Sequence, residues 1–247
     1  MEWHDRGYIL ATRKHGESAL IVSALTENRG RQAGLVRGGA GRRKRGGLQV
    51  GNLVTLDWRG RLPEHLGTLT TEVLETPAAA LLDRPLGLAV LSAACAVAEA
   101  LLPEGEEHPA IYHGFAGLMA VLDEPEQGVL LGSAYVQWEM GVLGELGFGL
   151  DLSACAATGT NEDLTHVSPR SGRAVSREAA EPYAERMFVL PAFLLSADSS
   201  ADADDVLKGL SLTGHFLERR VYGADTSGLP AARERFVEIL RTKGVPA

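Results

Sequence analysis

The sequence has only two cysteines in 247 residues, Cys95 and Cys155. Two thiols cannot form the disulfide framework that stabilises many small secreted domains. Cys95 lies in an apolar stretch, where a free thiol behaves as a small hydrophobic residue. The N-terminus lacks a basic segment followed by an apolar run, which is the pattern of a secretory signal peptide. These features predict a reduced, cytoplasmic protein.

The sequence also lacks the motifs of the common enzyme classes. It has no Gly-x-Ser-x-Gly elbow, no His-Glu-x-x-His pair and no P-loop. No apolar run reaches the roughly 18 residues that suggest a membrane span, so no membrane partner is expected. A protein without catalysis is predicted. The alternative is an enzyme that uses His108, His113 or His166, but these histidines form no recognisable constellation.

Charge is abundant but unevenly distributed. The net charge is −8, yet residues 1–77 hold 12 Lys/Arg against 8 Asp/Glu, while the remaining 170 residues hold 12 against 24. Residues 28–61 alone carry nine cations and one acid, Asp57. A cationic strip on an acidic protein indicates a surface for a polyanion. The alternative is a solvated surface loop with no ligand.

This strip supplies the predicted nucleic-acid-binding residues. Its centre is the Gly-rich segment Gly38–Gly47, with four consecutive cations, and Trp58 is the aromatic side chain predicted to stack on bases because cations flank it. Few aromatic residues are present (6%), so binding is expected to be mostly electrostatic and weakly sequence-specific. The predicted set is Arg29, Arg31, Arg37, Arg42, Arg43, Lys44, Arg45, Trp58, Arg59 and Arg61.

The pattern of the chain predicts an α+β protein with a change of class near residue 77. Five short strands are expected at residues 8–13, 19–25, 31–37, 53–58 and 68–74, and glycines at their bends fit a small closed barrel such as an OB-fold. An SH3-like barrel is the alternative. Residues 78–247 are expected to form a helical bundle, beginning with a helix over 78–102. The predicted domains are therefore 1–77 and 78–247.

Residues 151–190 are expected to interrupt the bundle as a polar, loop-like insertion. Positions 155, 158, 176 and 179 have the spacing of a four-cysteine zinc ribbon. Only Cys155 is a thiol, because the other three positions are Thr158, Ser176 and Ala179. The insertion is therefore predicted to be a degenerate zinc ribbon that holds no metal, and no cofactor is expected.

Several segments together resemble the RecO recombination-mediator family. They are Gly7-Tyr-Ile-Leu, His15-Gly-Glu, Gly30-Arg-Gln-Ala-Gly-Leu-Val-Arg-Gly-Gly, Leu146-Gly-Phe-Gly-Leu-Asp-Leu, Cys155-Ala-Ala-Thr-Gly and Val167-Ser-Pro-Arg-Ser-Gly-Arg-Ala-Val-Ser. The resemblance extends over essentially the whole chain. It implies an N-terminal OB-fold, a C-terminal helical domain with a zinc-ribbon-like segment, and a DNA repair role without catalysis. A generic OB-fold RNA-binding or translation factor is the alternative function.

The resemblance also implies partners. Such proteins act in the RecF pathway, bind single- and double-stranded DNA, anneal strands, and work with RecR to load RecA onto strands coated by the single-stranded DNA-binding protein (SSB). They contact the acidic C-terminal tail of SSB, and a nucleoid-associated location follows from this role. Candidate cations for the tail are Arg84, Arg219 and Arg220.

Overall fold

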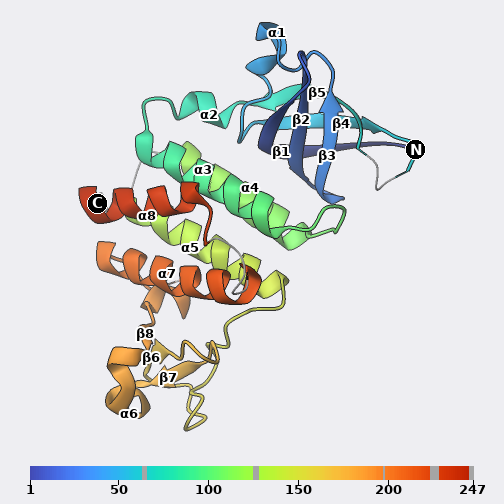
Figure 1. Cartoon of the computed structure of the whole chain (residues 1–247). Helices are drawn as coiled ribbons and strands as arrows, with labels where there is room; N and C mark the ends of the chain where they lie inside the picture. Colours follow the sequence, from blue (N-terminus) through green and yellow to red (C-terminus); the bar gives the residue numbers. More distant parts are fainter. Residues whose placement is uncertain (63–65, 125–127, 197, 223–227, 245–247) are drawn as a thin grey trace. The chain divides into compact units, whose positions relative to one another are not determined.

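The computed structural model describes residues 1–62, 66–124, 128–196, 198–222 and 228–244, with only the backbone at Arg43, Arg220, Val221, Tyr222 and Lys243. The chain divides into two compact units (Figure 1). Unit 1 comprises residues 1–125 and 230–233, and unit 2 comprises residues 126–229 and 234–247. The predicted domain boundary at residue 77 stays a prediction, since these units describe packing and not independent folding.

Four antiparallel pairings and one parallel pairing join the five strands of unit 1 into a closed barrel. The strands are β1 (Glu2–His15), β2 (Ala19–Thr26), β3 (Gly30–Val36), β4 (Leu53–Arg59) and β5 (Gly67–Glu75), in the order β1-β2-β3-β5-β4. The expected first strand, 8–13, was too short. Strand β1 pairs with β4 through its first half and with β2 through its second half, so one strand serves two neighbours. The five-stranded N-terminal fold is confirmed.

Alternating apolar residues on these strands fill the barrel. Ile9, Val22, Val54 and Leu56 are almost completely buried there. Trp58 fills one end of the interior, against Gly60 and Gly67, where an added methyl group would collide with its ring. The glycines are therefore needed to accommodate this large side chain.

Helices α1 (Arg42–Arg45), α2 (Pro77–Ala80), α3 (Pro85–Leu101) and α4 (Pro109–Asp123) complete unit 1. The single helix expected over residues 78–102 is wrong, because the chain leaves the helix after Ala80 and restarts at Pro85. Proline fits the first turn of a helix but restricts the residue before it to extended conformations. Helix α3 packs on β1 and β2. The apolar residues Ile111, Phe115, Leu118 and Leu122 recur at helical spacing along α4 and are buried.

Unit 2 combines a helix pair with a small sheet. Gly132 on α5 (Gly128–Glu145) and Gly209 on α7 (Ala203–Phe216) lie against valines of the opposite helix, which lets the two helices approach closely. Asp202 caps α7 through the backbone N–H of Asp205 at 2.8 Å. The π-helix η3 (Leu217–Tyr222) and helix α8 (Ala231–Lys243) follow. The expected helical region is confirmed, and none of the described helices is both long and apolar enough to cross a membrane.

Residues 151–190, expected as a loop-like insertion, contain regular structure. Strands β7, β6 and β8 form a three-stranded sheet in that order, and short helical turns follow β7 and β8. The elements are β6 (Leu164–Val167), β7 (Ala174–Ser176), α6 (Arg177–Ala180), η1 (Glu181–Arg186), β8 (Phe188–Val189) and η2 (Ala192–Leu194). Buried apolar residues on β6 and β7 explain why this polar segment still folds.

Candidate nucleic-acid interface

The Gly-rich segment 38–47 leaves β3 and returns beside the turn between β1 and β2. Its backbone is tied there by the N–H of Ala40, which donates to Ser18 O at 3.0 Å. Asn52 donates from Nδ2 to the carbonyls of Gly46 and Gly47, both at 3.2 Å. The segment contains one helical turn, α1, where the sequence indicated only a loop. The barrel therefore holds the basic segment at both of its ends.

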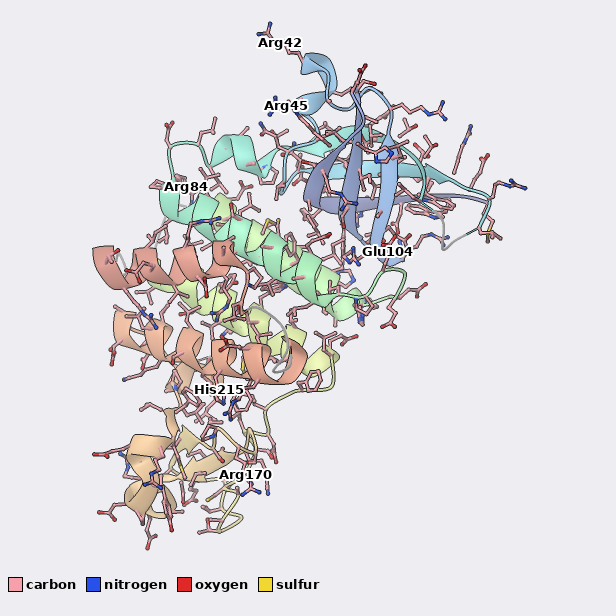
Figure 2. The ribbon with its side chains drawn as sticks, in the orientation of Figure 1. Arg42, Arg45, Arg84, Glu104, Arg170 and His215 are labelled. Carbon is pink, nitrogen blue, oxygen red and sulfur yellow. The ribbon has the colours of Figure 1, made fainter. Side chains whose placement is uncertain are left out.

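The cations of this segment face solvent. Arg37, Arg42, Lys44 and Arg45 are all exposed. Figure 2 shows Arg42 on α1 at the edge of unit 1. Lys44 Nζ donates to Arg37 O at 3.2 Å, and no described carboxylate lies within ion-pair distance of Arg37, Arg42 or Arg45. The Arg43 side chain lies outside the described residues. The described cations are thus available to an anion.

A pocket of about 540 Å³ lies under this segment. Lys14 from β1 and Arg45 from α1 line it, together with Thr12, Gln49 and the acid Glu17. Neither Lys14 nor Arg45 is buried, so both side chains keep their hydration and can exchange it for a phosphate oxygen. The geometry suits contact with the sugar-phosphate backbone of a nucleic acid.

The remaining predicted cations lie elsewhere on the barrel. Arg29, in the turn between β2 and β3, places its guanidinium carbon 5.4 Å from the centre of the Trp3 ring. Arg59 Nε lies 3.4 Å from Glu2 Oε1, and Arg61 is exposed just beyond β4. These three residues are near the start of β1, whereas the segment 38–47 is near its end. The sequence placed them in one strip, but the structure separates them into two groups.

Arg31 belongs to neither group. Its Nε donates to Leu102 O at 2.7 Å and its Nη1 lies 3.6 Å from Glu99 Oε1, with only 17% of the side chain exposed. Glu99 also accepts a hydrogen bond from Ser23 Oγ at 2.5 Å. Arg31 therefore joins β3 to helix α3, and its guanidinium is already committed to protein acceptors.

The predicted base-stacking role of Trp58 is contradicted by its position. Trp58 is 2% exposed inside the barrel and presents no face to solvent. Its cross-strand neighbour Trp3 is only half-buried and lies parallel to it, with ring centres 5.8 Å apart. The signal that could have distinguished them is glycine at positions 60 and 67, which makes room for Trp58 inside the barrel.

The cations predicted for an acidic tail are in different units. Arg84, in unit 1, donates from Nη2 to Glu124 O at 2.5 Å and is half-buried. Arg219, in unit 2, is exposed on η3, and the side chain of Arg220 lies outside the described residues.

Cys155 is buried within residues 151–190, the segment expected to be a degenerate zinc ribbon. Its Sγ accepts hydrogen bonds from Ser176 N at 3.3 Å and Ser176 Oγ at 3.4 Å. Burial raises the pKa of the Cys155 thiol, but hydrogen bonds from Ser176 and Thr158 outweigh this and lower the pKa to about 6. Across the described residues, no cluster of three or more His, Cys, Asp or Glu side chains has metal-binding geometry.

Two arginines of this segment have nearby acids. Arg173 Nε lies 3.1 Å from Asp151 Oδ2, and Arg177 Nε lies 3.0 Å from Asp163 Oδ2. Hydrogen bonds from Ser153 and then Arg173 hold the pKa of Asp151 below its usual value.

The histidines of the enzymatic alternative do not belong to one unit, since His166 is in unit 2 and His108 and His113 are in unit 1.

Comparison with known proteins places both parts of the chain in one family. Residues 1–77 match the family model described as recombination protein O N terminal, and residues 83–228 match the one described as recombination protein O C terminal. The DNA repair protein RecO of Rhodospirillum rubrum is 51% identical over 244 residues, covering 98% of this chain and 97% of its own.

Further relatives give the same result. The DNA repair protein RecO of Rhodospirillum centenum is 48% identical and covers 98% of this chain and 95% of its own, and that of Caulobacter vibrioides is 48% identical and covers 94% and 95%. These matches do not favour the alternative of an RNA-binding or translation factor. With its five-stranded barrel, its helical region and these full-length similarities, the chain belongs to the RecO family of DNA repair and recombination proteins.

Proposed function

We propose that this protein binds single- and double-stranded DNA through the exposed cations at the β1–β2 end of the barrel and anneals complementary strands. The observation that carries this proposal is the exposed group Arg37, Arg42, Lys44 and Arg45 on a protein of net charge −8. An acidic protein gains nothing in solubility from such a group, whereas a phosphate backbone offers it several partners at once.

The type of contact explains annealing. Exposed Arg and Lys side chains neutralise phosphates and release condensed counterions without reading base edges. Two strands held in this way repel each other less, and their bases remain free to pair. This role requires no bond to be made or broken, so the protein acts without catalysis.

The same proposal includes the protein partners of a recombination mediator. RecR would act with this chain in the RecF pathway, and together they would help load RecA onto SSB-coated strands in the cytoplasm, at the nucleoid. The acidic tail of SSB requires a cation beside an apolar surface. Arg219 and Arg84 are the described candidates for that cation, and Arg220 is the third.

We further propose that residues 151–190 fold without zinc. The hydrogen bonds from Ser176 to Cys155 support this, because they satisfy the sulfur that a metal would otherwise bind. Thr158 and Ala179 offer no thiolate, and a structural zinc site requires four ligands. Elemental analysis of the purified protein should therefore find less than one zinc per chain, and a stoichiometric amount would contradict the proposal.

Annealing of SSB-coated complementary strands tests the function. The test variant replaces Arg42, Arg43, Lys44 and Arg45 with alanine. The matched control makes the same charge change on unit 2, by replacing Arg186, Lys208, Arg235 and Arg241 with alanine. The first variant should anneal slowly and the control should behave as the unsubstituted protein. Equal rates for both variants would refute the assignment of the basic segment.

A further inference from the structure

A second pocket in unit 1, of about 490 Å³, lies at the start of β1. Trp3, Arg29 and Gln32 line it from the barrel, and Glu104 and Glu107 line it from the connection between α3 and α4. Figure 2 shows Glu104 at the end of the barrel away from Arg42 and Arg45. This pocket is therefore separate from the basic segment on which the proposed function rests.

The wall that carries Glu104 and Glu107 is fixed to the barrel. Gly105 N donates to Arg31 O at 2.9 Å, and Glu104 and Arg31 form an isolated β-bridge. Gly30 lies so close to this connection that an added methyl group would meet Glu106 O. The pocket is thus built by two backbone contacts and does not depend on side chains alone.

Trp3 provides a flat apolar wall. Trp58 supports the ring at an interplanar angle of 4°, so the ring is held in one orientation. The exposed guanidinium of Arg29 lies over the Trp3 ring, and no described carboxylate lies within ion-pair distance of it. A planar ligand can lie on the Trp3 ring if the Arg29 guanidinium moves away from the ring and covers the outer face of the ligand. Aromatic and guanidinium planes both stack on nucleobases.

The rim of the pocket is rich in hydrogen-bond acceptors. Glu104 and Glu107 contribute carboxylates, with Glu104 Oε2 4.0 Å from Arg31 Nη1. Gln32 donates from Nε2 to Arg29 O at 2.9 Å, so its carbonyl oxygen remains as a further acceptor. Guanine carries adjacent N–H donors on its pairing edge, which one carboxylate can accept together. Thymine carries a single N–H donor there, so this rim suits guanine best.

We propose that this pocket receives one unpaired base of a bound DNA strand and prefers guanine. The inference rests on the proposed function, since it assumes that single-stranded DNA binds the barrel. Carboxylates at the rim disfavour a phosphate at this point, whereas a neutral base avoids their repulsion. A basic side chain of a protein partner is the alternative occupant, and an arginine-containing peptide tests it.

Fluorescence titrations with short oligonucleotides test this assignment. The probes are an oligothymidine and the same strand with one central guanosine, at low salt. Trp3 is the one half-exposed tryptophan of the three, so quenching should report on it. The guanosine strand should bind about 3- to 10-fold more tightly than oligothymidine. Equal affinities without quenching would overturn the proposal.

Substitutions separate stacking from edge recognition. Trp3→Leu keeps an apolar side chain over Trp58 but removes the stacking face, and it should weaken binding about 5- to 100-fold and abolish quenching. Replacing Glu104 and Glu107 with glutamine should remove the guanosine preference and leave the affinity for oligothymidine unchanged. Glu72→Gln, an exposed carboxyl change on β5, is the matched control and should keep the preference.

The outcomes distinguish this inference from the proposed function. If Trp3→Leu binds both strands as the unsubstituted protein does while alanine at positions 42–45 weakens binding, the pocket assignment is wrong and the function stands. If Trp3→Leu instead loses affinity only for an arginine-containing peptide, the pocket belongs to a protein partner and the inference is also wrong. If the unsubstituted protein fails to bind either strand, the proposed function itself fails.

Discussion

The molecule has two arginine-rich segments, and their arginines do different things. In the segment 38–47 and its flanks, Arg37, Arg42 and Arg45 are exposed without a described acidic partner. In residues 151–190, Arg173 and Arg177 lie 3.1 and 3.0 Å from Asp151 and Asp163. Both segments contain several arginines, but only unpartnered cations gain much from meeting a phosphate. The comparison indicates that the lack of a nearby acid, more than the number of cations, predicts a surface that can bind an anion.

The largest expected effect is on DNA affinity. Alanine at Arg42, Arg43, Lys44 and Arg45 should lower the affinity for single-stranded DNA about 100-fold at low salt, and reduce the slope of log K against log salt by about 3, since each lost phosphate contact removes about 0.7. Filter binding at several salt concentrations measures both values. The control with four substitutions on unit 2 should keep the original slope.

Arg31 on β3 and Arg37 just beyond its end allow a partnered arginine to be compared with an unpartnered one. Arg31→Ala leaves Leu102 O without its donor and removes the cation beside Glu99, so it should lower the free energy of unfolding by about 1–3 kcal/mol. The Arg37 side chain is exposed, so Arg37→Ala should change the free energy of unfolding by less than about 0.5 kcal/mol. Urea unfolding measures the difference.

The two substitutions should have the reverse order in DNA binding. Arg37→Ala should weaken it, and Arg31→Ala should not once the protein is folded, because its guanidinium already contacts Leu102 and Glu99. A larger loss of DNA affinity for Arg31→Ala than for Arg37→Ala would show that Arg31 leaves its protein partners to bind DNA.

Cys155 allows a test of what holds residues 151–190 together. Its pKa is about 6 in the folded protein and near 9 in an unfolded chain, so unfolding takes up a proton between these values. Stability from this group is therefore fully present above pH 9 and is lost as the pH falls through 6. The melting temperature should rise more between pH 6 and 9 for the unsubstituted protein than for Cys155→Ser.

Cys95 provides the matched control for this measurement. Burial raises the pKa of the Cys95 thiol, so it stays protonated in the folded protein over the same range. Cys95→Ser should therefore retain the rise between pH 6 and 9 that Cys155→Ser loses. An identical pH profile for Cys155→Ser and the unsubstituted protein would show that this thiol is not ionised in the fold.

Sequence patterns were sufficient for the barrel because each strand carries its own alternation, and for α4 because its apolar spacing is helical. They failed where a distant contact decides the outcome. Trp58 looks like a binding residue beside Arg59, yet Gly60 and Gly67 make space for it inside the barrel. Arg31 is indistinguishable in the sequence from the neighbouring cations, but its side chain donates a hydrogen bond to the carbonyl of Leu102, 71 positions away. Tertiary partners of this kind have no local signature.

The small sheet was missed for a related reason. Strand β7 has only three residues and β8 has two, which is too short for an alternating pattern to be visible. Their pairing with β6 stabilises them, as do the hydrogen bonds from Ser176 to Cys155, 21 positions away. The predicted DNA-contacting cations remain predictions, now divided between two ends of the barrel.

The smallest expected effect concerns the partnered arginines. Both side chains of the Arg177–Asp163 pair are more than half exposed, so solvent screens their attraction. Arg177→Ala should therefore lower the free energy of unfolding by only about 0.5 kcal/mol, and leave the DNA affinity and its salt slope unchanged. Urea unfolding and filter binding measure both. Alanine at positions 42–45 should flatten the salt slope. If Arg177→Ala flattened it as well, the Arg177–Asp163 pair would open on DNA. The presence of an acidic partner would then no longer distinguish the arginines of the two segments.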